Sequence, residues 1–163
     1  MTRPIKVMFF CLGNICRSPL GEGLFLRAVA DRGLADRFEV ASSGTSGFHV
    51  GESPDPGSVR VARAHGVDIT NQRAQKLTSA HLTGYDYVVG MSASNMRDAR
   101  RMRGAEAANL LLLRDFEPDP ARRGLDTPDP YYIGGDSFDE VYGIVDRCVG
   151  RLLDHIVAEW GLA

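Results

Sequence analysis

The chain has little of what membrane-spanning, disulfide-stabilised and nucleic-acid-binding proteins need. No apolar run reaches the roughly 18 residues of a membrane-spanning helix, and a strand-length apolar segment, not a signal peptide, follows Met-Thr-Arg-Pro. Only three residues are cysteine, and two of them lie five positions apart, which is a poor disulfide framework. The formal net charge of −2 provides no bulk attraction for nucleic acid or a membrane surface. We therefore expect a cytoplasmic protein that binds neither.

Length and apolar content suit a single domain. With 163 residues, 44% of them hydrophobic, the chain can bury one core, so residues 1–163 are expected to form one domain. Apolar and amphipathic segments alternate: strands are predicted near 5–10, 37–42, 85–91 and 108–113, and helices near 18–32, 55–65, 93–102 and 137–159. Asp55, Ser92 and either Asp136 or Ser137 are expected to cap the last three helices. The alternation predicts an α/β fold, a parallel sheet with helices on both faces.

One long segment does not fit this alternation. Residues 114–135 contain four prolines and several aspartates, without helical or strand periodicity. Long ordered loops in compact domains often carry function. We therefore expect a functional loop here.

The most informative segment is Cys-Leu-Gly-Asn-Ile-Cys-Arg-Ser at residues 11–18, which follows the first apolar run. A loop between a strand ending near residue 10 and a helix beginning near Ser18 would turn successive backbone N–H groups inward, beside the positive end of the helix. Such a loop suits a phosphate monoester. The same field, with the Arg17 charge and the Ser18 hydroxyl, is expected to keep Cys11 ionised as a nucleophile.

Three residues of this segment suit an oxyanion-binding loop. The planar guanidinium of Arg17 can donate two parallel hydrogen bonds to phosphoryl oxygens, which a lysine cannot. Gly13 allows tight backbone curvature, and Asn14 tolerates left-handed backbone geometry.

Hydrolysis of a phosphate ester also needs a group that protonates the leaving oxygen. The long segment offers Asp129, which Pro130, Tyr131 and Tyr132 follow. The proline stiffens the chain, and the two tyrosines can line a cleft and lower its dielectric constant, which favours the protonated acid. Asp129 is therefore the candidate general acid, although Asp-Pro is also common in simple turns.

Together these residues resemble the low-molecular-weight protein tyrosine phosphatase family. The resemblance rests on Cys-Leu-Gly-Asn-Ile-Cys-Arg-Ser-Pro at 11–19 and Asp-Pro-Tyr-Tyr at 129–132, and extends through Ser-Ser-Gly-Thr at 42–45 and Phe-Asp-Glu-Val-Tyr at 138–142. It implies a three-layer domain whose four-stranded parallel sheet has the order 2-1-3-4. It also implies a phosphotyrosine protein phosphatase without metal or cofactor, expected to be a monomer and to bind phosphate and similar oxyanions.

The resemblance also implies a role for each site residue. Cys11 would attack phosphorus and form a phosphocysteine, while Asp129 would protonate the leaving oxygen and then activate water. Arg17 and the loop amides would hold the phosphoryl oxygens, and Ser18 would stabilise the Cys11 thiolate. The other implied residues are Leu12, Gly13, Asn14, Ile15, Cys16, Ser18 and Ser42 for phosphate binding and loop support, and Phe48, His49, Tyr131 and Tyr132 for the substrate cleft. That cleft is expected to favour phosphotyrosine over phosphoserine.

Some positions depart from the family pattern. Gln72 stands where relatives often have a histidine that joins the network behind the loop; glutamine can form hydrogen bonds but cannot titrate. Ser92 and Gly21 replace a usual aspartate and alanine, outside the assigned chemistry.

Three other functions share parts of the pattern. A thiol-dependent arsenate reductase of the same fold needs a cysteine pair near the third strand, whereas Cys148 lies in the last predicted helix. Relatives that prefer phosphoarginine tend to have threonine at the position of Ile15. A non-catalytic phosphopeptide-binding module would need neither nucleophile nor acid.

Several residues allow two interpretations. Cys16 is either a small buried apolar residue or, as in the family, a partner that traps oxidised Cys11 in a reversible disulfide. Zinc at this cysteine pair is the weaker idea, because the four histidines are scattered in the sequence, so no metal site is predicted. The arginine-rich stretch at 97–103 is either a solvated helix face or a docking surface for acidic peptides. Tyr131 and Tyr132 are cleft walls or phosphorylation sites.

Overall fold

The computed structural model describes residues 3–133 and 137–162. Its centre is a four-stranded parallel sheet in the order β2-β1-β3-β4, as expected. The strands are β1 (Ile5–Cys11), β2 (Phe38–Gly44), β3 (Tyr87–Gly90) and β4 (Leu110–Leu112). Strands β1 and β2 pair along their whole length, so Cys11 lies beside Gly44 where both strands end.

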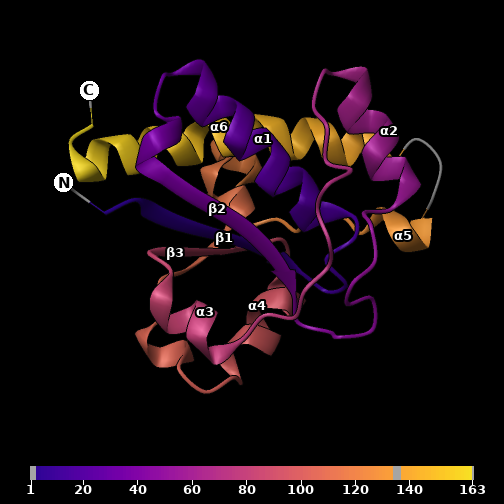
Figure 1. Cartoon of the computed structure of the whole chain (residues 1–163), viewed down its shortest axis with the longest axis horizontal. Helices are drawn as coiled ribbons and strands as arrows, with labels where there is room; N and C mark the ends of the chain where they lie inside the picture. The colour runs from indigo at the N-terminus through magenta and orange to yellow at the C-terminus, as the bar shows by residue number, and fades with distance from the viewer. Residues whose placement is uncertain (1–2, 134–136, 163) are drawn as a thin grey trace.

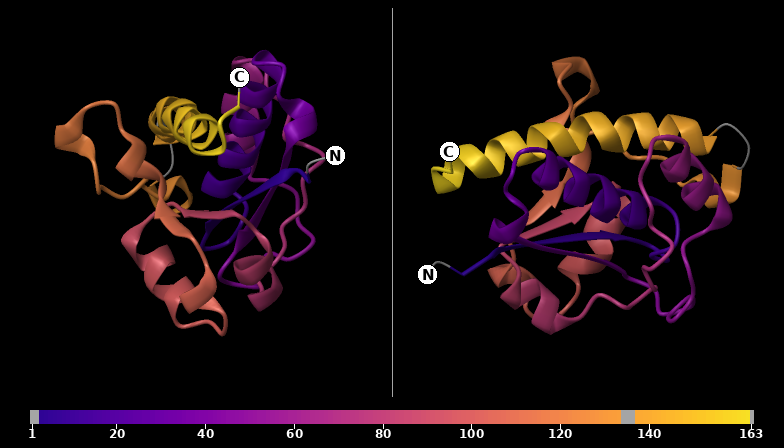
Figure 2. Two further views of the ribbon diagram at one scale, coloured as in Figure 1. Left: turned by 90° about the vertical axis from the view of Figure 1, so that its left-hand side faces the viewer. Right: turned by 45° about the horizontal axis from the view of Figure 1, so that its top comes forward.

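Helices cover both faces of the sheet (Figures 1 and 2). One face carries α1 (Arg17–Asp31), α2 (Pro56–Ala64) and α6 (Ser137–Trp160), and the other carries α3 (Ser79–Gly84) and α4 (Ala93–Arg100). In β1, Val7 and Phe9 join the core under α1 and α6, whereas Met8 and Phe10 join the core over α3 and α4. Side chains of a strand alternate between faces, so a central strand in which residues 7–11 are all apolar requires cover on both faces.

The predicted helix starts are partly confirmed. Asp55 caps α2 by accepting a hydrogen bond from Gly57 N at 2.8 Å, and Ser92 caps α4 by accepting one from Asn95 N at 3.2 Å. Ser137 is the first residue of α6, and Asp136 lies outside the described residues.

The segment at 114–135 is more regular than predicted. It contains helix α5 (Pro130–Ile133) and 3₁₀ turns at Leu113–Phe116 and Pro120–Arg122, in addition to the turns at Ala35–Arg37 and Ala105–Ala107 elsewhere. Pro120 and Pro130 each stand at the first position of a turn, where the missing N–H has no helical partner to lose. These two prolines therefore begin short helical elements. The number of prolines in the segment predicts an irregular loop instead.

A buried ionic cluster ties this segment to α6. The Glu117 carboxylate, in a residue only 1% exposed, accepts hydrogen bonds from Arg114 Nε at 2.7 Å and Arg147 Nε at 2.6 Å. Burial alone would raise the pKa of Glu117, but hydrogen bonds and charges from Arg147 and Arg114 hold it below its usual range. Arg114 also donates to the backbone oxygen of Asp126 at 2.8 Å, three residues before Asp129.

An apolar stripe on α6 from Phe138 to Ile156 packs against the core on this face of the sheet, with Cys148 fully buried among its residues. Trp160, the last residue of α6, is 37% exposed, and its indole N–H donates to the Tyr87 hydroxyl at 2.9 Å. Within the described ranges, no helix is both long enough and apolar enough to cross a membrane.

Candidate active site

The loop between β1 and α1 lies at the C-terminal edge of the sheet, beside the end of β2. The backbone oxygens of Cys11 and Leu12 accept hydrogen bonds from Thr45 N at 3.0 Å and Ser46 N at 2.9 Å. The N–H groups of residues 12–15, in contrast, have no hydrogen-bond partner in the part of the chain that the structure describes. Ordered backbone donors without partners need water or an anion, so this loop suits an oxyanion.

Gly44 allows the loop to approach β2 closely. A Cβ atom at this position would lie 2.7 Å from the backbone oxygen of Leu12 and 3.0 Å from the backbone nitrogen of Asn14. The first distance is shorter than a real Cβ contact and the second is tighter than most, and both neighbours are backbone atoms that cannot rotate away. Glycine here is therefore a requirement of the loop geometry.

Asn14 fixes the curvature of the loop. It has a φ of 58°, in the left-handed region, and its side chain is almost fully buried. Its Nδ2 donates to Ser18 Oγ at 2.8 Å and Ser42 Oγ at 3.0 Å, and its Oδ1 accepts from Gln75 N at 2.9 Å. One side chain thus connects the loop to α1, β2 and the segment before α3.

The Cys11 thiol lies at the bottom of this loop, 2% exposed and 3.1 Å from Ser18 Oγ. Since Ser18 Oγ already accepts from Asn14, its proton is available to donate, and the sulfur and the Ser43 backbone oxygen at 3.3 Å are the acceptors in reach. A thiolate is the stronger acceptor, because hydrogen bonds to ionised groups are shorter and stronger. The Ser18 hydroxyl is therefore placed to donate to the sulfur of Cys11.

Two supporting residues were missed by the sequence analysis. Glu22 Oε1 accepts a hydrogen bond from Ser42 Oγ at 2.7 Å; burial raises the pKa of Glu22, and the hydrogen bond from Ser42 offsets part of this shift. Gln75 Nε2 donates to the backbone oxygen of Ser42 at 3.0 Å. The sequence carries a signal for Glu22 as a supporting residue, because it lies four residues after Ser18 and therefore on the same face of α1.

Gln72 does not join this network as its family counterpart would. Its Nε2 donates to the backbone oxygen of Pro19 at 3.1 Å, at the start of α1. Its Oε1 is buried without a hydrogen-bond partner among the described residues. The loop's own contact from this part of the chain comes from Gln75 instead.

Arg17 and Asp129, which are 112 residues apart, meet above the loop. Arg17 is 5% exposed and donates from Nη1 to the Thr127 backbone oxygen at 3.1 Å and from Nη2 to Asp129 Oδ2 at 3.3 Å. The other carboxylate oxygen of Asp129 accepts from Tyr131 N at 3.1 Å, in the first turn of α5. Arg17 Nε is buried without a partner in the described ranges, so this guanidinium retains a donor.

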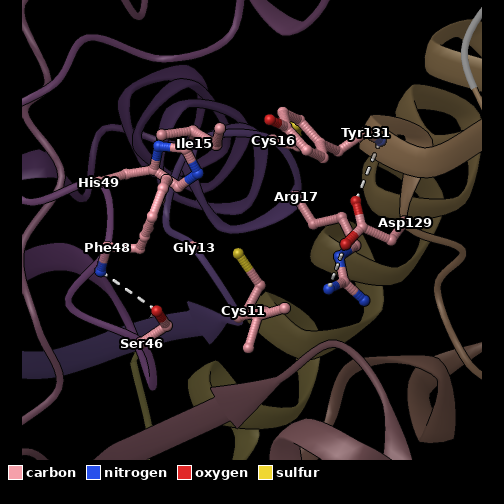
Figure 3. A pocket seen from close by; sticks show the side chains of 11 residues that line it. Cys11, Gly13, Ile15, Cys16, Arg17, Ser46, Phe48, His49, Asp129 and Tyr131 are labelled. Carbon is pink, nitrogen blue, oxygen red and sulfur yellow. Dashed lines mark hydrogen bonds and ion pairs between the residues drawn. The ribbon is translucent and has the colours of Figure 1, made fainter.

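These residues line a cleft of about 390 Å³ (Figure 3). In Figure 3 the Cys11 sulfur lies between Arg17 and Asp129 on one side and Phe48 and His49 on the other. The full lining is Cys11, Leu12, Gly13, Ile15, Cys16, Arg17, Ser46, Phe48, His49, Asp129 and Tyr131. It brings together most of the expected site residues and adds Ser46.

Aromatic rings form the rim of the cleft. Phe48 is 83% exposed, and its ring centre lies 4.9 Å from that of His49, which in turn lies 6.0 Å from that of Tyr131. His49 Nδ1 is 3.0 Å from a carboxylate oxygen of Glu52, which orients the imidazole. The backbone of Tyr132 belongs to α5, but its side chain lies outside the described part of the structure.

Cys16 lines the cleft but differs from Cys11 in its surroundings. It is 3% exposed, and burial, together with the negative charge of Asp55, raises the pKa of its thiol. Its exchange with an oxidised Cys11 stays a prediction. Among the described residues, no three His, Cys, Asp or Glu side chains gather as metal ligands would.

A family model for low molecular weight phosphotyrosine protein phosphatases matches residues 6–160. The chain belongs to this family. It is 38% identical over 156 residues to low molecular weight protein-tyrosine phosphatase A of Mycobacterium tuberculosis, covering 96% of this chain and 94% of that one.

Solved structures agree with this assignment. YfkJ of Bacillus subtilis superimposes on the phosphatase with a TM-score of 0.90 at 33% identity, covering 97% of this chain and 98% of that one. A Drosophila arginine phosphatase superimposes with a TM-score of 0.84 at 27% identity, covering 93% and 98%. The fold is thus shared with a protein named as an arginine phosphatase, whereas the relative from Mycobacterium tuberculosis is named as a tyrosine phosphatase.

Proposed function

We propose that this phosphatase hydrolyses phosphotyrosine and other aryl phosphate monoesters through a phosphocysteine on Cys11. The observation that carries the proposal is the position of the thiol. It lies in the loop whose N–H groups at residues 12–15 have no partner among the described residues, with a guanidinium and a carboxyl group above it. A thiol, an oxyanion site and an acid at one point are the parts of two-step phosphoryl transfer.

In the first step the Cys11 thiolate attacks phosphorus, an S–P bond forms, and the bond to the ester oxygen breaks. Arg17 and the loop amides hold the three equatorial oxygens. In the free protein Asp129 is held by Arg17 at 3.3 Å. A bound dianion competes for that guanidinium, so substrate binding releases Asp129 from Arg17 and leaves its carboxyl group free to donate a proton to the leaving oxygen.

In the second step a water molecule attacks phosphorus and gives its proton to the Asp129 carboxylate. The S–P bond breaks, Cys11 becomes a thiolate again, and inorganic phosphate is released as the product. Ser18 is placed to assist here, because its hydroxyl is 3.1 Å from the sulfur that regains the negative charge.

The cleft favours an aromatic ester over phosphoarginine. Its walls above the loop are Ile15, Phe48, His49 and Tyr131, so a flat phenyl ring finds apolar and aromatic contacts. Within the described part of the lining, the carboxyl groups that a guanidinium would need are limited to Asp129, which already contacts Arg17. Phosphoarginine is therefore the second candidate substrate.

Arsenate reduction and phosphopeptide binding without catalysis both lack support from the geometry. An arsenate reductase would need further accessible thiols, but Cys148 is fully buried in α6, where burial raises its pKa to about 12. A pure binding module would not need a carboxyl group opposite the thiol.

The proposal is tested by turnover of an aryl phosphate and a phosphotyrosine peptide in the presence of a metal chelator. We expect turnover in the wild type, inhibition by vanadate and no turnover in Cys11→Ser. Undiminished turnover in Cys11→Ser would exclude Cys11 as the nucleophile. Faster turnover of phosphoarginine than of phosphotyrosine would replace the substrate assignment.

A further inference from the structure

The solvent face of α4 and the turn that follows it carry four exposed arginines. Arg97 and Arg100 lie on α4 at i and i+3, Arg101 is the C-cap of the helix, and Arg103 lies in the turn after it; all four are exposed. None of them forms an ion pair with a described residue. The opposite face of the helix is buried through Asn95, Met96 and Ala99. We call the four arginines the α4 basic face.

This face is unusual for the molecule. Four arginines and one aspartate fall within residues 97–103, in a chain whose formal net charge is −2. Several arginines elsewhere on the surface are paired with carboxylates, namely Arg3 with Asp86, Arg27 with Asp146, Arg32 with Asp154 and Arg60 with Asp139. The nearest acidic residues in the sequence are Asp98, which accepts from Thr45 Oγ1 at 3.5 Å, and the exposed Glu106. The basic face is therefore only weakly neutralised from within the chain.

Helix α4, which carries most of the basic face on its C-terminal half, begins beside the catalytic cleft. Ser92, the cap of α4, lines a second hollow of about 320 Å³ together with Arg17 and Asp129. The contact of Asp98 with Thr45 places the middle of α4 beside the chain that leads to Ser46 in the cleft wall. Figure 1 shows α4 next to the end of β2.

The distances suit a peptide that leaves the cleft along α4. At 1.5 Å per residue, Arg97 to Arg101 lie roughly 7 to 14 Å along the helix axis from Ser92. An extended peptide advances about 3.3 Å per residue, so this interval corresponds to roughly two to four residues of substrate.

We propose that the α4 basic face docks acidic side chains of the substrate, a few residues from the phosphotyrosine. The inference rests on the proposed phosphatase function and specifies its substrates as tyrosine-phosphorylated segments rich in Asp and Glu. The negative charge of the rest of the chain opposes a broad anionic surface such as a membrane or nucleic acid, whereas a short acidic segment meets only this face. Complementary charge of this kind acts on encounter and selection more than on the chemical step.

The test compares two phosphotyrosine peptides that differ only in carrying glutamates or glutamines at positions two to four residues from the tyrosine. At low ionic strength the wild type is expected to show kcat/KM about three- to tenfold higher for the acidic peptide. The ratio should fall towards one in Arg97→Gln/Arg101→Gln and at about 0.5 M salt, where exposed charges are screened. Arg151→Gln is the matched control, since Arg151 is an exposed, unpaired arginine on α6, across the sheet.

The outcomes separate the two proposals. The docking proposal would be overturned if the preference for the acidic peptide persisted in Arg97→Gln/Arg101→Gln. It would also be overturned if Arg151→Gln lost the preference equally. Binding of vesicles rich in anionic lipid that the double variant loses, without a change in the peptide ratio, would assign the face to membranes instead. Failure of the phosphatase proposal would appear as absent turnover of a small aryl phosphate, which does not reach α4.

Discussion

Replacement of Gly44 by alanine tests how closely the phosphate-binding loop depends on β2. The new Cβ atom would lie 2.7 Å from Leu12 O and 3.0 Å from Asn14 N, so the loop backbone has to move. Overpacking of this kind costs about 1–3 kcal/mol of stability. A displacement of about 1 Å in a catalytic group costs on the order of a hundredfold in rate. We therefore expect kcat/KM for an aryl phosphate to fall about a hundredfold, and phosphate to inhibit more weakly.

The assay combines steady-state kinetics, phosphate inhibition and thermal unfolding. A stability loss of that size corresponds to about 2–10 °C in Tm for a chain of this length. Gly143→Ala is the matched control, because a Cβ there meets no atom within 4 Å and alanine favours the interior of α6. That control should gain about 0.5–1 kcal/mol and keep its kinetics. Wild-type kcat/KM in Gly44→Ala would refute the tight coupling of loop and strand.

Three further changes test other parts of the site. Asp129→Asn should lower kcat/KM, which reports the first step, by several orders of magnitude for esters with poor leaving groups and much less for good ones, measured over a series of substituted phenyl phosphates; a uniform loss would place the acid elsewhere. Asn14→Ala removes three buried hydrogen bonds and puts alanine at a φ of 58°, so phosphate affinity and Tm should both fall, and calorimetry showing unchanged affinity would contradict this. Glu117→Gln leaves Arg114 without its counter-charge and should cost about 3–5 kcal/mol at neutral pH, measured by urea unfolding. Because the pKa of Glu117 is lowered in the folded protein, its contribution is present above the ordinary value of 4.5 and is lost as the pH falls below that value, so the stabilities of variant and wild type should converge in acid.

The sheet order and the layer structure could be predicted because they depend on local pattern and on resemblance. β1 is apolar at every position that faces either core, and this requires helices on both sides whatever the loops do. The short helices α3 and α5 were missed, because four to six residues show little periodicity.

The residues of the site likewise fall into those that the sequence predicts and those that it does not. Cys11, Arg17 and Asp129 were recognisable because their residue types and spacing follow from the chemistry they would perform. Gln75 and the backbone oxygen of Thr127 were not, because each contacts the loop through backbone atoms across a long sequence separation. Contacts made by backbone atoms leave no mark on residue type, so only the folded structure reveals them.

The central claim, that Cys11 carries the phosphoryl group, is tested most directly by trapping the intermediate. Asp129→Ala removes the group that would activate water, so the second step should slow while a good leaving group still permits the first. Rapid acid quenching after mixing with an aryl phosphate, followed by mass spectrometry of peptides, should show one phosphoryl group on Cys11. An unmodified Cys11 throughout a burst of phenol release, or the phosphoryl group on another residue, would contradict the account.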